Sequence, residues 1–183
     1  GHTHTRAAGA LILPVTPAQD LNEAARNAER QVTSEVASAL TTGNPLNDQM
    51  ITDVVQQRLQ GEEANNIVSW RQFWLDLIAW RAGFKPNVTG VFEEFTNTLS
   101  AERVVIGSFD GIETLFSRLR ISEGEKAAVE SLLRLVPDWL SQLPGKNVGC
   151  VIFIREDLAR YALINNFKQF SDRYDAFSLR WNW

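Results

Sequence analysis

Two short apolar runs in the second half of the chain constrain the fold most. Residues 104–109 and 148–154 are nearly continuous in apolar side chains and rich in β-branched ones, without strict alternation. This pattern is typical of strands buried on both faces of a parallel sheet. Between them, a long helix is predicted that begins at a capping box of Ser122 and Glu125 and is kinked or broken near Pro137. Strand, helix and strand in this order predict a right-handed βαβ crossover.

The first half of the chain is predicted to be all helical. Four helices are expected, over about residues 17–40, 45–60, 70–82 and 91–99. Thr16 and Asn44 are expected to cap the first two, and Ser69 with Gln72 forms a capping box at the third. The third helix is so rich in Trp, Phe, Leu and Ile that we expect it to be buried on most sides.

Together these elements predict an α/β fold with a three-layer, mainly parallel sheet, helices on both faces and a helical N-terminal half. A further helix is expected over about residues 157–173, and the alternation in 177–183 suggests a third strand with one aromatic face. Residues 1–100 are interpreted as a helical subdomain or insertion and residues 101–183 as a βαβ core. The two are expected to form one domain that is incomplete at both ends.

Composition excludes several classes of function. A chain of 183 residues with 44% hydrophobic residues, a net charge of −4 and a pI near 5.3 has no basic field for nucleic acid or an anionic membrane. No apolar stretch reaches the roughly 18–20 residues that a membrane span needs. The single Cys150 lies in an apolar run and offers neither a disulfide framework nor a zinc site. We therefore expect a cytoplasmic protein.

The candidate site lies where the two apolar runs end, because ligands of open parallel sheets bind at the carboxyl ends of the strands. Asp110 follows the first run, and its carboxylate could hold Mg²⁺ through water. Glu113, three residues later, could orient or deprotonate an attacking water. Arg155 follows the second run and could reach a terminal phosphate from a neighbouring strand. These three residues make up half of a phosphoryl-transfer site.

The segment from Val104 to Leu115, with Phe109-Asp110-Gly111-Ile112-Glu113 at its centre, resembles the Walker B segment of STAND and NACHT-like signalling ATPases, in which apolar residues lead into Asp-Gly-Leu-Asp-Glu. Residues 151–155 resemble the following strand of these ATPases, which ends in a sensor Arg. Residues 136–140, 151–158, 166–167 and 179–181 also resemble the P-loop domain of large bacterial ATPases that carry a ParA/MinD-like module elsewhere. The resemblance covers most of residues 100–183 and implies that Asp110 is the magnesium acid, Glu113 the acid near the water and Arg155 the sensor.

One departure from this family is plain: no GxxxxGK[ST] occurs in the sequence, and Gly145-Lys146 is followed by Asn147 without the upstream glycine. Either the chain is the part downstream of a P-loop that lies before Gly1, or it is a degenerate module that no longer binds nucleotide. The first explanation is favoured. In both cases we expect the isolated chain to be a poor ATPase.

The expected function is therefore that of a fragment of a P-loop ATPase, with ATP and Mg²⁺ as cofactors of the full-length protein, which switches conformation in signalling, defence or regulation. A protein partner or self-association is expected, because the helical half offers a variable surface. The alternative is a non-enzymatic interaction module in which the helices of residues 17–83 bind another protein. A third reading is a metal-dependent nuclease or phosphatase built on Asp110, Glu113 and Asp157. Simple structural roles also exist: Asp110-Gly111 as a turn, and Arg155 as the surface partner of Glu156, Asp157 or Asp110.

Overall fold

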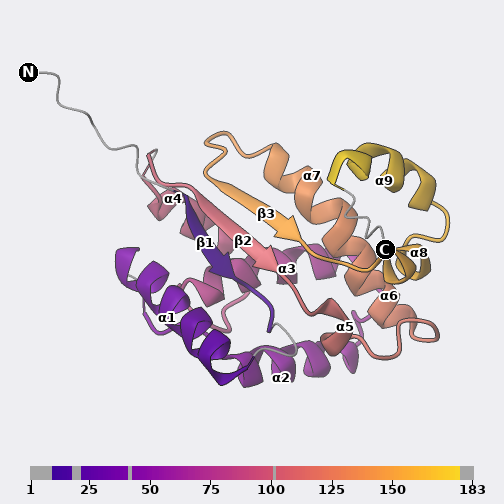
Figure 1. The fold of residues 1–183 in the computed structure, drawn as a ribbon, viewed down its shortest axis with the longest axis horizontal. Helices are drawn as coiled ribbons and strands as arrows, with labels where there is room; N and C mark the ends of the chain where they lie inside the picture. Colours follow the sequence, from indigo (N-terminus) through magenta and orange to yellow (C-terminus); the bar gives the residue numbers. More distant parts are fainter. Residues whose placement is uncertain (1–9, 18–21, 41–42, 101, 178–183) are drawn as a thin grey trace, which may run out of the picture.

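Three parallel strands form the only sheet of the described residues, in the order β1-β2-β3 (Figure 1). They are β1 (Leu11–Pro14), β2 (Val105–Phe109) and β3 (Val148–Ile152). The computed structural model describes residues 10–17, 22–40, 43–100 and 102–177. The mixed α/β class and the parallel pairing of the two predicted strands are therefore confirmed.

Strand β1 corrects the prediction of an all-helical first half. Leu11 pairs with Val105 and Pro14 with Ser108, so this short segment completes the sheet on the far side of β2. Four residues are too few to show a strand period in the sequence. The pairing joins segments that lie far apart in the sequence. Leu13 of this strand is fully buried in a core to which both halves of the chain contribute.

The helices follow the chain order shown in Figure 1. They are α1 (Glu23–Ala39), α2 (Asp48–Leu59), α3 (Ile67–Arg81), α4 (Phe92–Thr98), α5 (Ile112–Leu115), α6 (Glu123–Glu130), α7 (Val136–Ser141), α8 (Glu156–Ala162) and α9 (Phe167–Tyr174), with a π-helical turn over Ser131–Leu135 and a 3-10 turn over Asp175–Phe177. No helix of the described residues is long and apolar enough to cross a membrane.

Asparagine residues form the N-caps of the first three helices. Asn22, Asn47 and Asn66 each accept hydrogen bonds from backbone N–H groups in the first turn. The predicted caps Thr16, Asn44 and Ser69 are therefore wrong, although the helices themselves are present. An N-cap is fixed by extended backbone angles as well as by residue type, and several candidates in one loop compete for the position.

The predicted long helix between β2 and β3 contains a break. Ser122 accepts from the N–H of Glu125 and begins α6, as predicted. The chain then widens into the π turn before α7, whose second residue is Pro137. Proline lacks the N–H that an α-helix needs for its i−4 bond, and a π turn absorbs this loss. The kink or break expected near Pro137 thus takes the form of a π turn within an otherwise continuous helical stretch.

The C-terminal part differs from its prediction. The helix expected over residues 157–173 is divided into α8 and α9 by a turn at residues 163–166. Phe177 belongs to a 3-10 turn, and the rest of the strand expected over 177–183 lies outside the described residues.

Helix α3 packs under one face of the sheet and is buried on most sides, as predicted. Trp70 and Trp74 are fully buried, and the ring of Trp74 meets that of Phe109 edge-on at 6.0 Å. Gly107 of β2 lies close to its neighbours, since an added Cβ would lie 3.1 Å from Val15 Cγ2 and 3.5 Å from Ile78 Cγ1. Helix α7 packs under β3 on the same side, with Val136 and Leu140 buried.

The opposite face of the sheet is open in the part of the chain that the structure describes. Ile12, Val151 and Phe153 alternate with the buried residues and are 59%, 43% and 49% exposed. Figure 1 views the sheet from this side, and the helices α3, α4 and α7 lie behind the strands. A third layer over this face stays a prediction.

Asp76 of α3 holds the loop that leads into α4. Its two carboxylate oxygens accept from the N–H groups of Gly90 and Phe92, at 2.7 and 3.1 Å, and Gln72 donates to the same side chain. Asp76 is fully buried, and burial raises its pKa while these hydrogen bonds lower it. The carboxylate is the acceptor for backbone donors that have no water nearby.

We expect Asp76→Ala to lower the free energy of unfolding by roughly 2–5 kcal/mol, because two buried N–H groups lose their acceptor. Urea denaturation measures the change. Asp53→Ala is the control, since this exposed acid of α2 accepts from the side chain of Gln49 one turn away, and we expect an effect within about 0.5 kcal/mol. A similar small loss for both variants would contradict the role given to Asp76.

Burial raises the pKa of the Cys150 thiol to about 11. An unfolded cysteine has a pKa of about 8.5, so only the unfolded state ionises between these values, and the contribution of Cys150 to stability is lost as the pH rises through them. At pH 8 we expect the native thiol to react with iodoacetamide roughly 100-fold more slowly than in urea. Equal rates in native and unfolded protein would show that the thiol is not held in an apolar site.

Candidate functional site

The carboxyl ends of β1 and β2 are tied together by Thr16. Its hydroxyl donates to the carbonyl oxygen of Asp110 at 2.6 Å and accepts from the N–H of Asp110 at 2.9 Å. Thr16 is 1% exposed, so water does not replace either bond. The backbone of Asp110 is therefore fixed at the sheet edge, where the sequence analysis expected a candidate residue.

Asp110 presents an exposed carboxylate at the end of a buried strand. One carboxylate oxygen accepts from the N–H of Gly111 at 2.8 Å. Gly111 has a φ of 67°, in the left-handed region that favours glycine, and this turn leads directly into α5. Glu113 lies in the first turn of α5 and is exposed. The two acids thus lie three residues apart at the same edge, as predicted.

Arg155 follows β3 and precedes α8. Its guanidinium donates twice to the carboxylate of Asp157, at 3.1 and 3.0 Å. The side chain is 67% exposed. The N–H of Phe153 donates to the carbonyl of Phe109 at 2.8 Å, so the backbones before Arg155 and Asp110 are neighbours. Arg155 therefore lies at the expected edge, but it is paired within its own turn with Asp157.

Sequence reasoning missed Arg81, the last residue of α3. This buried guanidinium donates to the carbonyls of Pro14 and Leu46, at 2.8 and 2.6 Å, and pairs with Asp48 at 3.2 Å. Burial lowers the pKa of Arg81, and the charges of Asp48 and Glu29 oppose this change. Arg81 joins the end of β1 to the segment before α2. Its position at a helix C-terminus is visible in the sequence, but its partners are not.

A negative field surrounds this end of the sheet. The pKa of Glu29 on α1 is raised by its burial and by the charges of Asp48 and Asp110, while Arg81 lowers it. The charges of Asp48, Asp110 and Arg81, from three other segments, thus all act on Glu29. Such a field attracts cations and repels an unaccompanied phosphate.

The described residues contain no group of three His, Cys, Asp or Glu side chains that could hold a metal ion by themselves. The nuclease or phosphatase reading, which needs Asp110, Glu113 and Asp157 to converge, is therefore not supported. Mg²⁺ in nucleotide sites is usually held by one or two carboxylates together with waters and substrate phosphates. The exposed carboxylate of Asp110 fits that smaller role, because nucleotide and water would supply the other ligands.

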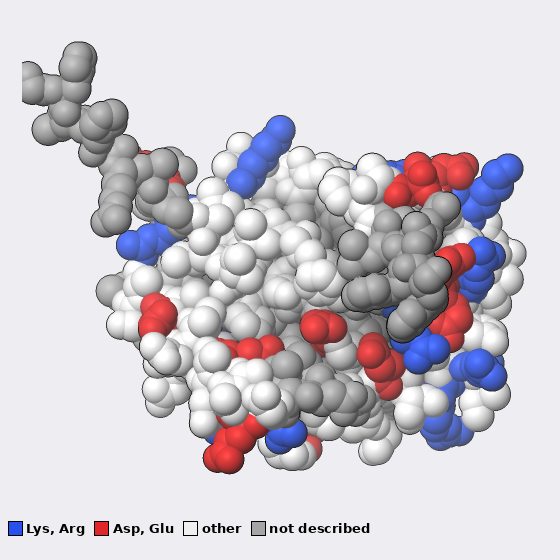
Figure 2. Space-filling view, viewed as in Figure 1, with Lys and Arg blue, Asp and Glu red and all other residues white. Residues whose placement is uncertain are grey.

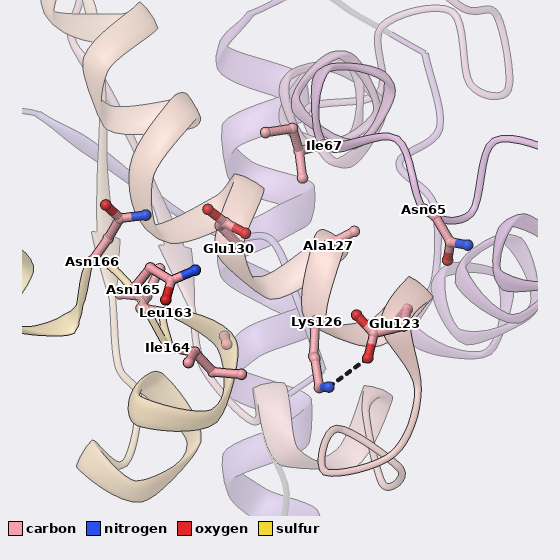
Figure 3. Close-up of a pocket in the computed structure, with 11 residues that line it drawn as sticks. Asn65, Ile67, Glu123, Lys126, Ala127, Glu130, Leu163, Ile164, Asn165 and Asn166 are labelled. Atoms are coloured by element: carbon pink, nitrogen blue, oxygen red, sulfur yellow. Dashed lines mark hydrogen bonds and ion pairs between the residues drawn. The ribbon is translucent and has the colours of Figure 1, made fainter.

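A hollow lies elsewhere on the described part of the molecule. A cavity of about 440 Å³ opens between α6, the loop before α3 and the turn after α8 (Figure 3). Asn65, Lys126, Glu130, Asn165 and Asn166 give it a polar wall, and the side chain of Lys126 is paired with Glu123 at 2.5 Å. None of the residues that line it is Asp110, Glu113 or Arg155.

No family model matches the chain, and no curated protein or solved structure matches it.

We expect Thr16→Val to lower the free energy of unfolding by roughly 1–3 kcal/mol, because it leaves two backbone groups of Asp110 without a partner. The same substitution should also accelerate the exchange of the Asp110 amide hydrogen with deuterium. Thr96→Val is the matched control, because the Thr96 hydroxyl donates to the nearby carbonyl of Glu93 within α4. An unchanged Asp110 amide in Thr16→Val would contradict the tie between β1 and β2.

Proposed function

We propose that this chain is the part downstream of the P-loop in a Mg-ATP-dependent ATPase, which acts as a conformational switch in signalling, defence or regulation. One observation carries the proposal. Asp110, whose backbone is bonded by Thr16 after β1, presents an exposed carboxylate where β2 ends. Glu113 follows in α5, and Arg155 follows the neighbouring strand β3. The resemblance of residues 104–115 to a Walker B segment supports the same assignment.

In this proposal Asp110 would hold Mg²⁺ through a water molecule, and the bound ion would supply positive charge beside the phosphates of ATP. Glu113 orients the water that attacks the terminal phosphate, since its place in α5 brings a second acid to the same edge. Its carboxylate accepts a hydrogen bond from that water, which turns a lone pair of the water oxygen toward phosphorus.

Arg155 senses the terminal phosphate in this proposal, and it must leave Asp157 to do so. The Arg155–Asp157 pair is exposed, and pairs of this kind contribute only about 0–1 kcal/mol. A guanidinium–phosphate contact that excludes water is stronger than such a pair. Exchange of one partner for the other would couple phosphate binding to the position of α8, which begins at the next residue.

The phosphate cradle must come from a segment other than Gly145-Lys146. These residues lie in the turn just before β3, at the amino end of the sheet, while Asp110 and Arg155 follow the carboxyl ends of their strands. A P-loop before Gly1 would supply the cradle. The single cysteine without a disulfide and the negative net charge support a cytoplasmic setting for such an enzyme.

A non-enzymatic interaction module is the second candidate. Apolar side chains are exposed on the helical half, with Val32 of α1 at 38% and Met50 of α2 at 40%. A protein partner seated on these helices would use the sheet only as a scaffold. In this case the carboxylate of Asp110 has no chemical role.

The native protein that includes the polypeptide before Gly1 distinguishes the two candidates. We expect Asp110→Asn to lower its Mg-dependent ATP hydrolysis at least about 100-fold, because the ion loses its carboxylate. Asp53→Asn, at an exposed residue of α2, controls for the loss of a charge and should leave hydrolysis unchanged. Hydrolysis that survives Asp110→Asn, or no hydrolysis by the wild-type protein, contradicts the ATPase proposal and favours the interaction module.

A further inference from the structure

Strand β3 forms an edge of the sheet that pairs with no second strand of the described residues (Figure 1). The carbonyl of Asn147 accepts from β2 and the N–H of Phe153 donates to it, and the ladder of a parallel pair repeats every second residue. The N–H and C=O groups of Val148, Cys150 and Ile152 therefore point away from β2. They form a row of hydrogen-bonding groups that no described strand uses.

The sequence of β3 lacks the features by which proteins protect an exposed strand. Proline, a charged side chain, a bulge or a covering helix ordinarily keeps such an edge from pairing with another chain. The opposite edge of the sheet has two of these features, since β1 ends at Pro14 and α1 lies beside it (Figure 1). Residues Val148–Ile152 contain neither proline nor charge and pair with β2 in an unbroken register. The strand is therefore able to accept a further strand.

A hollow of about 340 Å³ lies along this edge, between α7 and β3. Pro137 and Leu140 of α7 form one wall, and Val148 and Cys150 of β3 form the other. Helix α7 packs against β3 on the α3 side of the sheet, so it forms a floor for a neighbouring strand. Apolar side chains of that strand would fill the hollow, and its backbone would meet the edge of β3.

The other side of the edge is accessible as well. A Cβ added at Gly149 would have no described atom within 4 Å, and the side chains of Val151 and Phe153 are exposed. Figure 2 views this face, on which the Lys, Arg, Asp and Glu side chains lie mostly around the rim of a white surface. Neither the bulk nor the charge of the described residues therefore blocks an extended chain beside β3.

Lys146 stands at one end of the hollow. It lines the hollow just before β3 begins, and none of the ion pairs of the described residues involves it. An ammonium group at this place selects an acidic group at the matching end of a ligand. Backbone groups along the edge select an extended peptide over a helix, because a helix satisfies its own backbone hydrogen bonds.

We propose that the groove formed by the edge of β3, the hollow and Lys146 binds an extended peptide segment of another protein by strand addition, antiparallel to β3. Antiparallel pairing is the slightly more stable arrangement per residue. Alternate apolar residues of the peptide face α7, and an acidic residue near its carboxyl end faces Lys146. This inference goes beyond the ATPase proposal and uses a surface other than the helical half, so it holds whether or not the protein hydrolyses ATP.

The probe that tests the inference is an acetylated, amidated octapeptide of sequence Thr-Val-Thr-Val-Thr-Val-Thr-Asp. In the proposed register its valines face Val148, Cys150 and Ile152, and its aspartate faces Lys146. N-methyl groups on its threonines point away from β3 and keep the peptide from pairing with itself. The control peptide carries the N-methyl groups on its valines instead, which removes the N–H groups that bond β3. In NMR titrations of the ¹⁵N-labelled chain, we expect the control to bind at least about 10-fold more weakly.

A charge exchange tests the end of the groove. We expect Lys146→Glu to weaken binding of the probe at least about 5-fold and to strengthen binding of the same peptide ending in lysine. Lys168→Glu, at an exposed residue of α9, is the matched control and should change neither affinity. Bound probe should shift the amide signals of Val148, Cys150 and Ile152 most and slow their exchange with deuterium.

Equal affinity for the two methylated peptides, or signal changes confined to other elements, would overturn the inference. Edge amides that are already protected from exchange in the free chain would also overturn it. Light scattering would then assign the edge to the chain's own fold if the protein is a monomer, and to a second copy if it is a dimer. Unchanged exchange across α3 verifies that each variant is folded.

Discussion

The burial of α3 against one face of the sheet is the contact on which the rest of the structure depends. Trp74 lies edge-on to Phe109 of β2 and donates from its indole nitrogen to the carbonyl of Ala128 at 2.9 Å. One side chain thus joins the sheet, α3 and α6. Replacing a buried Trp or Phe by Ala typically costs 3–5 kcal/mol, which is comparable to the whole stability of many domains. The two halves of the sequence fold around this helix as one core.

The same helix connects the core to the candidate site. Arg81, its last residue, bonds the carbonyl of Pro14 where β1 ends, and two residues later Thr16 bonds both backbone groups of Asp110. The exposed carboxylate therefore rests on a buried chain of contacts that runs from α3 through β1 to β2. A site held in this way keeps its geometry in the absence of a ligand, which lowers the entropy lost on binding. Arg155 is different, because its exposed pair with Asp157 can change partners.

The parts of the fold that could be predicted are those with a long or local signal: the apolar runs of β2 and β3, the Trp-rich α3, the Ser122 cap and the break near Pro137. Strand β1 could not be predicted, because four residues carry no period and its pairing with β2 spans the whole helical half. At the site, the sequence predicted that Asp110 and Arg155 follow neighbouring parallel strands, and the pairing of β2 with β3 confirms that placement, while the roles of Asp110, Glu113 and Arg155 stay predictions. The sequence alone could not show that Thr16 bonds Asp110 rather than capping a helix, nor that Arg81 is buried. Both features depend on contacts between residues that are distant in the chain.

The most direct test of the central claim is to record where a metal–nucleotide complex binds. In a longer form of the protein that carries the P-loop required by the proposal, Mn²⁺ with ATP replaces Mg²⁺, and paramagnetic broadening of backbone amide NMR signals reports residues near the ion. Our account predicts loss of the signals of Thr16, Asp110, Gly111 and Glu113, while those of Asp53 and Asp138 persist. Broadening confined to the cavity around Lys126 and Asn165, or no broadening in the presence of ATP, would contradict it.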